Sequence, residues 1–353
     1  MSYTDHHLLR LSKALAIGAV GGAIFYALNM PLAWMMGAMV LTTIAALAGT
    51  SLHVPGRLRS VMVSILGVLL GSTFTPEALD RVMEWPLTLA SLALYLALVT
   101  SILYVYFRRV MGFDPATAYF SATPGGLSEM VFVGRAMGGD DRSIALVHGA
   151  RILLVVLTLP FWFRYAYGAG SAGGGAGNAS LADLGWLDGG VLLACAIFGP
   201  IVGKWLRLPA YRIVGPMLAS AAVHIAGVTS SAPPMELVAT AQVVIGSSIG
   251  ARFAGAPLGW VLKIIASSIG STSLMLGATV GFALVLAPLS GIPFAPIVLA
   301  FSPGGLAEMS LIALALGIET AFIATHHVAR ITMIVFAAPL IFKKLGVEPP
   351  TSP

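Results

Sequence analysis

The stretch "ATPGGLSEM" at residues 122–130 decides the fold, because it returns as "FSPGGLAEM" at residues 301–309. Both copies lie inside long apolar runs. A proline followed by two glycines cannot continue a helix, so each copy predicts a break between two helices. Each copy also places a glutamate three residues after the second glycine. A charge in the same apolar setting twice needs a structural or functional reason.

The composition predicts an all-α integral membrane protein. Only 9% of the 353 residues are charged, 58% are hydrophobic, and the mean hydropathy is +0.93. Soluble domains carry about 25% charged residues. Apolar stretches of about twenty residues, the length that spans a bilayer as a helix, recur along the chain. The alternating ten-residue pattern of membrane β-barrels is absent.

The net charge of +5 is better explained by membrane topology than by a nucleic-acid partner, because the basic residues flank the apolar runs. The single cysteine, Cys195, lies within an apolar run, which excludes a disulfide framework and a cysteine-based metal site. The N-terminal residues lead directly into an apolar run without an evident cleavage site. We therefore expect a retained first helix and not a removed signal peptide.

The chain contains an internal repeat. An offset of 179 in residue number links Thr123 to Ser302, and it also links Gly67 to Gly246, Gly71 to Gly250, Phe74 to Phe253, His148 to His327, Arg151 to Arg330 and Pro160 to Pro339. An offset of 178 links Pro31 to Pro209, Gly37 to Gly215, Met39 to Met217 and Gly49 to Gly227. These matches predict one membrane repeat at 12–165, a second at 190–344, and a Gly-rich linker at 166–189 between them.

Each repeat is predicted to contain six segments, of which the fifth is broken by the PGG motif. The predicted segments are 12–29, 32–50, 57–74, 85–107, 115–137 and 141–164, then 190–206, 211–228, 235–252, 257–288, 293–317 and 319–342. If both broken segments re-enter and the N-terminus is cytoplasmic, fourteen Lys and Arg side chains face the cytoplasm and two face outside. If both cross, the split is nine to seven. The positive-inside rule favours re-entry, and crossing stays the alternative.

Five crossings per repeat make the second repeat inverted relative to the first, an architecture common in secondary transporters. The half-helices at 114–122 and 127–137 are about 15 Å long, half of a bilayer core of about 30 Å. The two PGG tips would then meet near the midplane from opposite faces. This topology predicts a multi-pass protein of the bacterial inner membrane with both termini in the cytoplasm.

The PGG motif has the chemistry of an anion site. The break frees the N–H groups that begin the second half-helix, and their dipole favours an anion or a carboxylate. Glycine allows a ligand to approach the backbone closely. A packing kink is the alternative, but two copies with a glutamate favour a site. The predicted substrate-binding residues are Thr123, Pro124, Gly125, Gly126, Ser128, Ser302, Pro303, Gly304, Gly305, Arg151 and Arg330.

A second motif follows each tip. "LVHGAR" (146–151) and "THHVAR" (325–330) place His and Arg three residues apart on one helix face. Charges near the bilayer centre are costly and indicate function by default. Pairing of these arginines with Glu129 and Glu308 would suit either a structural lock or a coupling device. We expect Glu129, Glu308, His148 and His327 to be the coupling residues, since imidazole titrates near physiological pH. Metal binding is not expected.

The paired PGGL-[SA]-E-M elements, the His-x-x-Arg after each, and the total length resemble the AbrB-type bacterial inner-membrane protein family. Members of that family are often labelled ammonia monooxygenase and sometimes regulator. An oxygenase needs clustered His or carboxylate ligands, and a DNA-binding regulator needs a soluble basic module. The sequence has neither. The resemblance implies a duplicated inner-membrane protein and supplies no substrate.

These observations predict a secondary transporter for a small, carboxylate-bearing metabolite. The substrate would bind between the two PGG tips, with H⁺ or Na⁺ as the coupling ion. The alternative is a membrane sensor or regulatory protein that binds a small ligand in the same pocket without net transport. An enzyme is not expected, and neither is a cofactor or a nucleic-acid partner. The bilayer is the expected environment, and assembly as a homo-oligomer is left open.

Overall fold

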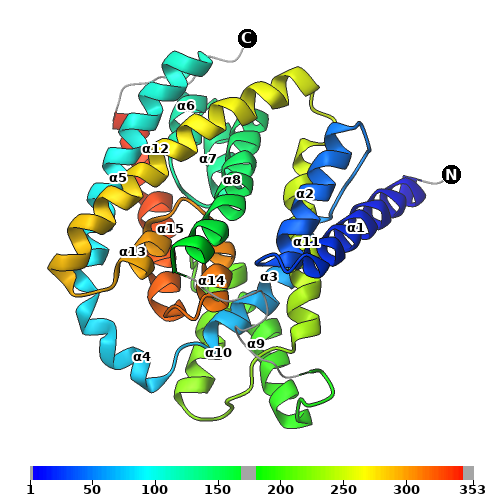
Figure 1. Cartoon of the computed structure of the whole chain (residues 1–353), viewed down its shortest axis with the longest axis vertical. Helices are drawn as coiled ribbons and strands as arrows, with labels where there is room; N and C mark the ends of the chain where they lie inside the picture. The colour runs from blue at the N-terminus through cyan, green and yellow to red at the C-terminus, as the bar shows by residue number, and fades with distance from the viewer. Residues whose placement is uncertain (1–2, 168–179, 345–353) are drawn as a thin grey trace. The chain divides into compact units, whose positions relative to one another are not determined.

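The computed structural model describes residues 3–167 and 180–344, and within these ranges the chain is helical without a strand (Figure 1). The prediction of an all-α fold is confirmed. The helices are α1 (Tyr3–Ala27), α2 (Ala33–Leu47), α3 (Gly56–Gly71), α4 (Pro76–Asp80), η1 (Arg81–Glu84), α5 (Pro86–Tyr106), η2 (Phe107–Met111), α6 (Pro115–Ala122), α7 (Leu127–Ala136), α8 (Asp141–Tyr167), α9 (Trp186–Trp205), α10 (Tyr211–Ile225), α11 (Met235–Gly250), η3 (Ala251–Phe253), α12 (Leu258–Ser290), α13 (Phe294–Phe301), α14 (Leu306–Ala315) and α15 (Thr320–Lys344).

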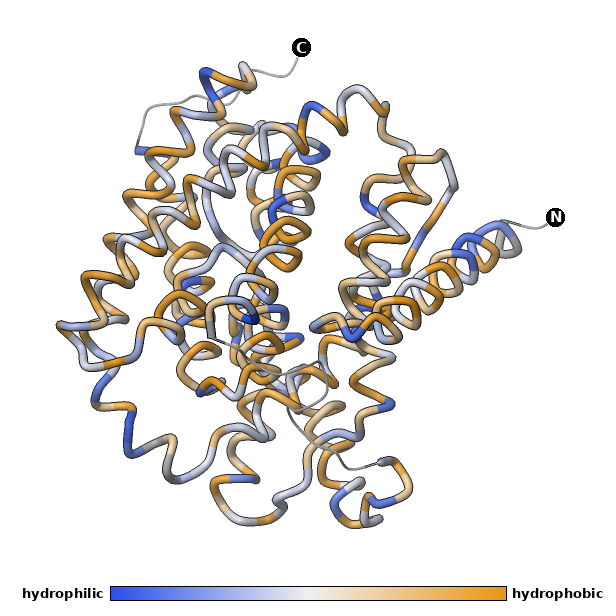
Figure 2. The backbone as a smooth tube through the Cα atoms, in the orientation of Figure 1, coloured by the Kyte–Doolittle hydropathy of each residue, from blue (hydrophilic) through white to orange (hydrophobic). Residues whose placement is uncertain are grey.

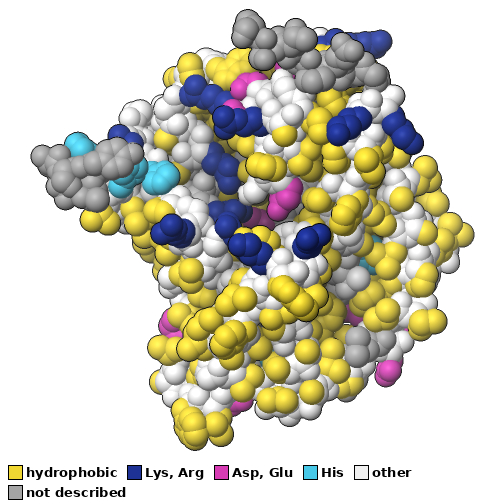
Figure 3. All heavy atoms as spheres, turned by 180° about the vertical axis from the view of Figure 1, so that it is seen from behind, with side chains coloured by type: hydrophobic (Ala, Val, Ile, Leu, Met, Phe, Trp, Pro, Cys, Tyr) yellow, Lys and Arg dark blue, Asp and Glu magenta, His cyan; other side chains and the backbone are white. Residues whose placement is uncertain are grey.

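Among the described residues, six helices are long and apolar enough to cross a membrane: α1, α5, α8, α9, α12 and α15. Hydrophobic residues predominate along the helices in Figure 2, and hydrophobic side chains cover much of the surface in Figure 3. The chain is therefore a helical membrane protein. The other four predicted crossings, α2, α3, α10 and α11, have only 15 or 16 residues. They measure about 23 Å, less than a core of about 30 Å, so ten crossings stay a prediction.

Each broken segment is a pair of short helices. α6 ends at Ala122 and α7 begins at Leu127, while α13 ends at Phe301 and α14 begins at Leu306. We call residues 123–126 the first tip and residues 302–305 the second tip. The sequence explains these bounds. Asp114 caps α6 by accepting a hydrogen bond from the Thr117 N–H (2.9 Å), and the proline in each tip has no N–H to donate.

Backbone features repeat along the chain at the predicted offsets. Leu32 and Ala210, which the offset of 178 relates, have φ of 46° and 48°. Asn29 and Arg207, related in the same way, have φ of 52° and 54°, although positive φ is uncommon for residues other than glycine. At the offset of 179, the eight-residue α6 matches the eight-residue α13, and the ten-residue α7 matches the ten-residue α14. The two halves therefore share local structure as well as sequence.

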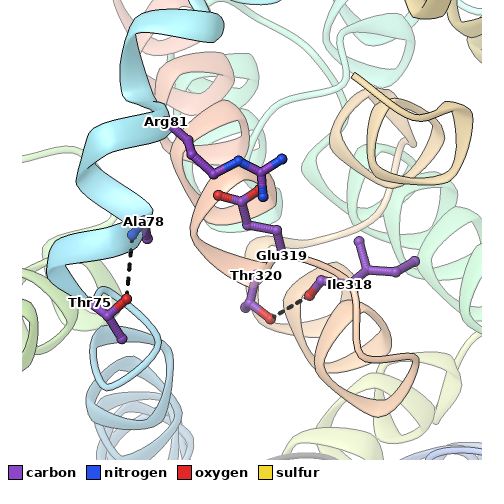
Figure 4. A network of polar contacts seen from close by, with 6 residues as sticks. All are labelled: Thr75, Ala78, Arg81, Ile318, Glu319 and Thr320. Carbon is purple, nitrogen blue, oxygen red and sulfur yellow. Dashed lines mark hydrogen bonds and ion pairs between the residues drawn. The ribbon is translucent and has the colours of Figure 1, made fainter. Parts of the chain in front are cut away.

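The connection between the halves differs in part from expectation. Half of the predicted linker at 166–189, residues 168–179, lies outside the described residues, while residues 166 and 167 belong to α8 and residues 186–189 to α9. Two short elements, α4 and η1, were not predicted. They lie beside the start of α15, where the Arg81 guanidinium pairs with the Glu319 carboxylate at 3.0 Å (Figure 4). In the same view the Ala78 N–H donates to Thr75 Oγ1, which starts the turn of α4.

The chain forms two compact units, and each takes segments from both halves of the sequence. Unit 1 consists of residues 1–81, 156–256 and 307–321, and unit 2 of residues 82–155, 257–306 and 322–353. Unit 2 contains both tips and both His-x-x-Arg motifs. It therefore contains every predicted site residue except Glu308, which lies in unit 1.

Unit 1 is built on close glycine contacts between helices. A Cβ at Gly37 of α2 would collide with the backbone of Gly21 in α1, and a Cβ at Gly215 of α10 would collide with the backbone of Gly199 in α9. The offset of 178 relates one contact to the other. Gly67 and Gly71 of α3 lie against the backbone of α10, and their counterparts Gly246 and Gly250 of α11 lie against the backbone of α2. Small residues allow these helices to pack with their backbones in contact.

Unit 2 is built around α5, which packs against α6, α12 and α13. The centre of this packing is Tyr95, whose ring is fully buried and contacts Phe282 and Phe301 edge to face, at centroid distances of 5.4 and 5.3 Å. The Tyr95 hydroxyl and Thr279 Oγ1 of α12 are hydrogen-bonded at 2.9 Å. Unit 2 thus has a polar group in the middle of an apolar core.

Candidate functional site

A histidine in each half joins a long helix to a half-helix. His148 of α8 lies 2.9 Å from the Phe120 carbonyl through Nε2, and His327 of α15 lies 3.0 Å from the Leu299 carbonyl through Nε2. Both carbonyls belong to the last turn of a half-helix, where carbonyls have no partner within the helix. Because a carbonyl only accepts, Nε2 carries the hydrogen in both rings, and Nδ1 of the neutral ring is an acceptor.

The two arginines have different partners. Arg151 Nη2 donates to Nδ1 of His148, one turn earlier on α8, at 2.8 Å. Arg330 instead donates from Nη1 to the Ser302 carbonyl at 2.6 Å and from Nη2 to the Gly304 carbonyl. Arg330 therefore holds the second tip, whereas Arg151 is held by a histidine.

A backbone hydrogen bond forms a tight turn within the first tip. The Gly125 N–H donates to the Thr123 carbonyl at 2.8 Å. The Thr123 hydroxyl donates to the Tyr119 carbonyl, as the Ser302 hydroxyl does to the Val298 carbonyl at the second tip. α7 begins without a side-chain cap, so the N–H groups of its first turn can still bind an anion.

Both arginines of the motifs are buried cations. Arg151 is 4% exposed and Arg330 is 2% exposed. Their positive charges interact unfavourably with one another, and both interact with the Tyr95 hydroxyl. In the described part of the chain neither forms an ion pair, so the expected pairing with glutamate is not observed there. Within the same residues, Arg151 Nε and Nη1 and Arg330 Nε have no hydrogen-bond partner. These unpaired donors are suited to an anionic ligand.

The two glutamates lie in different surroundings. Glu129 is half-buried in the first turn of α7, and its carboxylate is folded back over Gly126, where a Cβ would collide with Oε2. Glu308 is 5% exposed in unit 1, where its charge interacts with Arg59 and Arg252. No motif in the sequence distinguishes these two arginines from the other basic residues. Their predicted place at the ends of apolar runs gave no sign of a buried carboxylate nearby.

A cavity of about 810 Å³ in unit 2 reaches the first tip. It is lined mainly by apolar side chains of α5 and α15, and Tyr119 and Thr123 also line it. Ile334, another lining residue, limits the space at the tip, since a Cβ at Gly125 would lie 2.8 Å from Ile334 Cγ2. A bulky side chain at Gly125 would therefore disturb the packing as well as the approach of a ligand.

Tyr95 and His326 are two further buried polar groups of unit 2. Tyr95 was missed, although Thr279, its partner, is an isolated hydroxyl in the apolar run of α12 and could have signalled it. His326, which precedes His327 in the second motif, is hydrogen-bonded to Thr88 Oγ1 at 2.9 Å and to the Phe322 carbonyl at 2.8 Å. Among the described residues, no group of three or more His, Cys, Asp and Glu could hold a metal ion.

Comparison with known proteins identifies the family to which the chain belongs. Residues 34–346 match the model of a family described as "Transition state regulatory protein AbrB". The protein YhjN of Bacillus subtilis (strain 168) is 26% identical over 97% of this chain and 94% of its own length. A protein of Escherichia coli (strain K12) with the name "Putative regulator AbrB" is 27% identical over 96% of both chains. The match covers nearly the whole chain, and the protein belongs to the AbrB family of membrane proteins.

Proposed function

We propose that this protein is a secondary transporter of a small, carboxylate-bearing metabolite. The observation that carries the proposal is the pair of buried arginines in unit 2, which have unpaired donors and no acidic partner among the described residues. Burying an unpaired charge costs several kcal/mol, and a buried charge is usually paired or serves function. An anion between the two guanidinium groups would remove their mutual repulsion and supply the missing acceptors. Arginine is well suited to carboxylates because its planar fork donates several hydrogen bonds at once.

The proposed substrate site lies in unit 2, between the two tips. Arg151 provides free donors on one side, and the uncapped first turn of α7 provides backbone N–H groups. The buried Tyr95 hydroxyl, within electrostatic range of both arginines, is a third polar group. The cavity that reaches Thr123 offers a route to this site. Glycines at the tips would allow a ligand to approach the backbone.

Two inverted repeats in the bacterial inner membrane are part of the proposal. Support comes from helices of matching length at the offsets of 178 and 179, and from the pairs of residues with positive φ. Further support comes from the charge distribution, which favours re-entrant broken helices and cytoplasmic termini. Inverted repeats with broken helices at the substrate site are a recurrent transporter architecture.

Proton or sodium coupling through the glutamates completes the proposed mechanism. Glu129 is beside the first tip, and Glu308 follows the second tip but interacts with Arg59 and Arg252. His148 is neutral while its Nδ1 accepts from Arg151, so a proton could bind there only if Arg151 moved away. Movement of Arg151 away from His148 would thereby make a proton site available. The position of Arg151 would then determine whether His148 can take up a proton.

A second candidate function is a membrane sensor that binds the same anion without net transport. The names of the matched family and of the Escherichia coli relative, which describe regulators, favour it. Both functions need the same binding site. Only flux of the ligand across a membrane separates them.

The proposed site is tested with purified protein in detergent and a thermal-shift screen of organic acids and amino acids. We expect at least one carboxylate to raise the melting temperature of the wild-type protein and to lose this effect in Arg151→Gln. Loss of charge-assisted hydrogen bonds worth about 1.5–3 kcal/mol weakens binding roughly 10- to 150-fold. Arg164→Gln, at an exposed position of the same helix, is the matched control. An equal response in both variants would show that Arg151 does not bind the acid.

A further inference from the structure

The two His–Arg motifs occupy matched positions in the repeats but have exchanged hydrogen-bond partners. On α8, the arginine donates to the histidine ring, through Arg151 Nη2 and His148 Nδ1. On α15, the arginine donates to the tip, and Nδ1 of His327 is buried without a partner among the described residues. Each motif therefore lacks the contact that the other motif makes.

The positions that would complete each motif are already in place. The His327 ring is oriented as the His148 ring is, since both donate through Nε2 to the equivalent carbonyls of Leu299 and Phe120. Its Nδ1 can thus accept from Arg330, which lies one turn further along α15. At the first tip, the offset of 179 makes the carbonyls of Thr123 and Gly125 the counterparts of those of Ser302 and Gly304. The Thr123 carbonyl can accept a second hydrogen bond beside that of the Gly125 N–H.

We infer that each arginine alternates between its histidine and its tip, and that the two motifs alternate in opposite phase. His148 and His327 are the positioning residues, because Nδ1 of each holds the arginine in the released state. A released arginine keeps N–H groups free for an anion, as Arg151 does here. In the other state, the arginine donates from two nitrogens to the carbonyls of its tip, as Arg330 does.

The two arrangements differ little in free energy because the exchange is nearly symmetric. When Arg330 leaves the second tip for His327, Arg151 leaves His148 for the first tip. The total number of arginine hydrogen bonds to tips and to histidines therefore stays the same. Between two states with matched hydrogen bonds, differential binding of an anion can select one. The inference uses the proposed function only for this last step, because the exchange itself needs no substrate.

Modification of arginine with phenylglyoxal tests the exchange in the full-length protein without any ligand. The reagent condenses with an unengaged guanidinium, and mass spectrometry of peptides gives the rate at each site, with the exposed Arg109 as internal reference. We expect both Arg151 and Arg330 to react in the wild-type protein. In His327→Gln the amide can still donate to the Leu299 carbonyl, but the Nδ1 acceptor is lost. Arg330 should then react at least fivefold more slowly, while Arg151 does not slow.

His148→Gln should give the reverse pattern, with slower reaction at Arg151 and not at Arg330. His327→Asn places an acceptor oxygen near the position of Nδ1 and should restore the rate at Arg330, which separates loss of the acceptor from general damage. Melting temperature and gel filtration establish that each variant is folded. The inference is overturned if Arg330 stays unreactive in the wild-type protein while Arg151 reacts, if the two Gln variants give the same pattern, or if neither changes a rate. Absence of a transported acid would leave these results unaffected.

Discussion

At the scale of single residues, the molecule places cations where a membrane protein usually avoids them. Arg151 and Arg330 are buried with no acidic partner in the described ranges, whereas the buried carboxylate of Glu308 interacts with Arg59 and Arg252 in the other unit. We propose that an anion from outside the protein completes the first arrangement. The second is a charge cluster within the protein, so its members are expected to contribute more to stability than to binding.

Glu308→Gln and Glu129→Gln should therefore differ in stability. Glu308→Gln removes the buried carboxyl group on which Arg59 and Arg252 act electrostatically without an ion pair among the described residues, and we expect it to lower the free energy of unfolding by about 1 kcal/mol. Glu129 is half-buried and forms no ion pair among the described residues, so its variant should change stability by about 0.5 kcal/mol or less. Melting temperatures of the two variants in detergent measure the difference. Equal melting temperatures would mean that the Arg59, Arg252 and Glu308 charges do not stabilise unit 1.

The sequence indicates the candidate site residues of the two motifs because each is unusual in its setting. A PGG motif and a His-x-x-Arg motif within apolar runs, each present twice, stand out without any structure. The hydrogen-bond partners of these motifs cannot be recognised in the sequence, because the partners are set by packing between distant segments. No local pattern predicts that Arg330 binds the Ser302 carbonyl while Arg151 binds a histidine, since the two motifs are equivalent in sequence.

At the scale of secondary-structure elements, glycines occupy two kinds of position within the helices. In α2 and α10, Gly37 and Gly215 lie against the backbones of neighbouring helices. In α12, a Cβ at Gly277 would meet open space. The first kind is required for close packing, and the second only lowers helix propensity.

Gly37→Ala should thus destabilise the protein by about 1–3 kcal/mol, because the added methyl group pushes α2 from α1. Gly277→Ala, a change of the same size in another helix, should raise stability by about 0.5–1 kcal/mol, since alanine is the better helix former. Melting temperatures in detergent compare the two variants. If Gly37→Ala is as stable as the wild-type protein, the α1–α2 contact is looser than the structure indicates.

Helix bounds follow from the sequence wherever proline or glycine interrupts an apolar run. The breaks at both tips, the start of α8 and the end of α12 lie close to their predicted positions for this reason. The short α4 and η1 were missed because they lie in a polar connection where the apolar pattern gives no signal. The predicted segments 32–50, 57–74, 211–228 and 235–252 are longer than α2, α3, α10 and α11, because they include the turns at the helix ends.

At the scale of the whole molecule, each unit combines segments from both halves of the chain. Unit 1 takes the first three helices of each half, and unit 2 takes both tips and both His–Arg motifs. The repeat in the sequence indicates duplication but not this exchange of segments, which depends on long-range packing. Both tips and both arginines consequently lie in one unit, which is where we propose that the ligand binds.

Counterflow in proteoliposomes tests the central claim, that this protein transports a carboxylate bound by the buried arginines. Vesicles containing purified protein are loaded with the acid that gave the largest thermal shift, and entry of the radiolabelled acid is measured. We predict rapid entry with the wild-type protein and with Arg164→Gln, and entry at least tenfold slower with Arg151→Gln. Entry no faster than in protein-free vesicles, for an acid that the wild-type protein demonstrably binds, would contradict transport and favour the sensor.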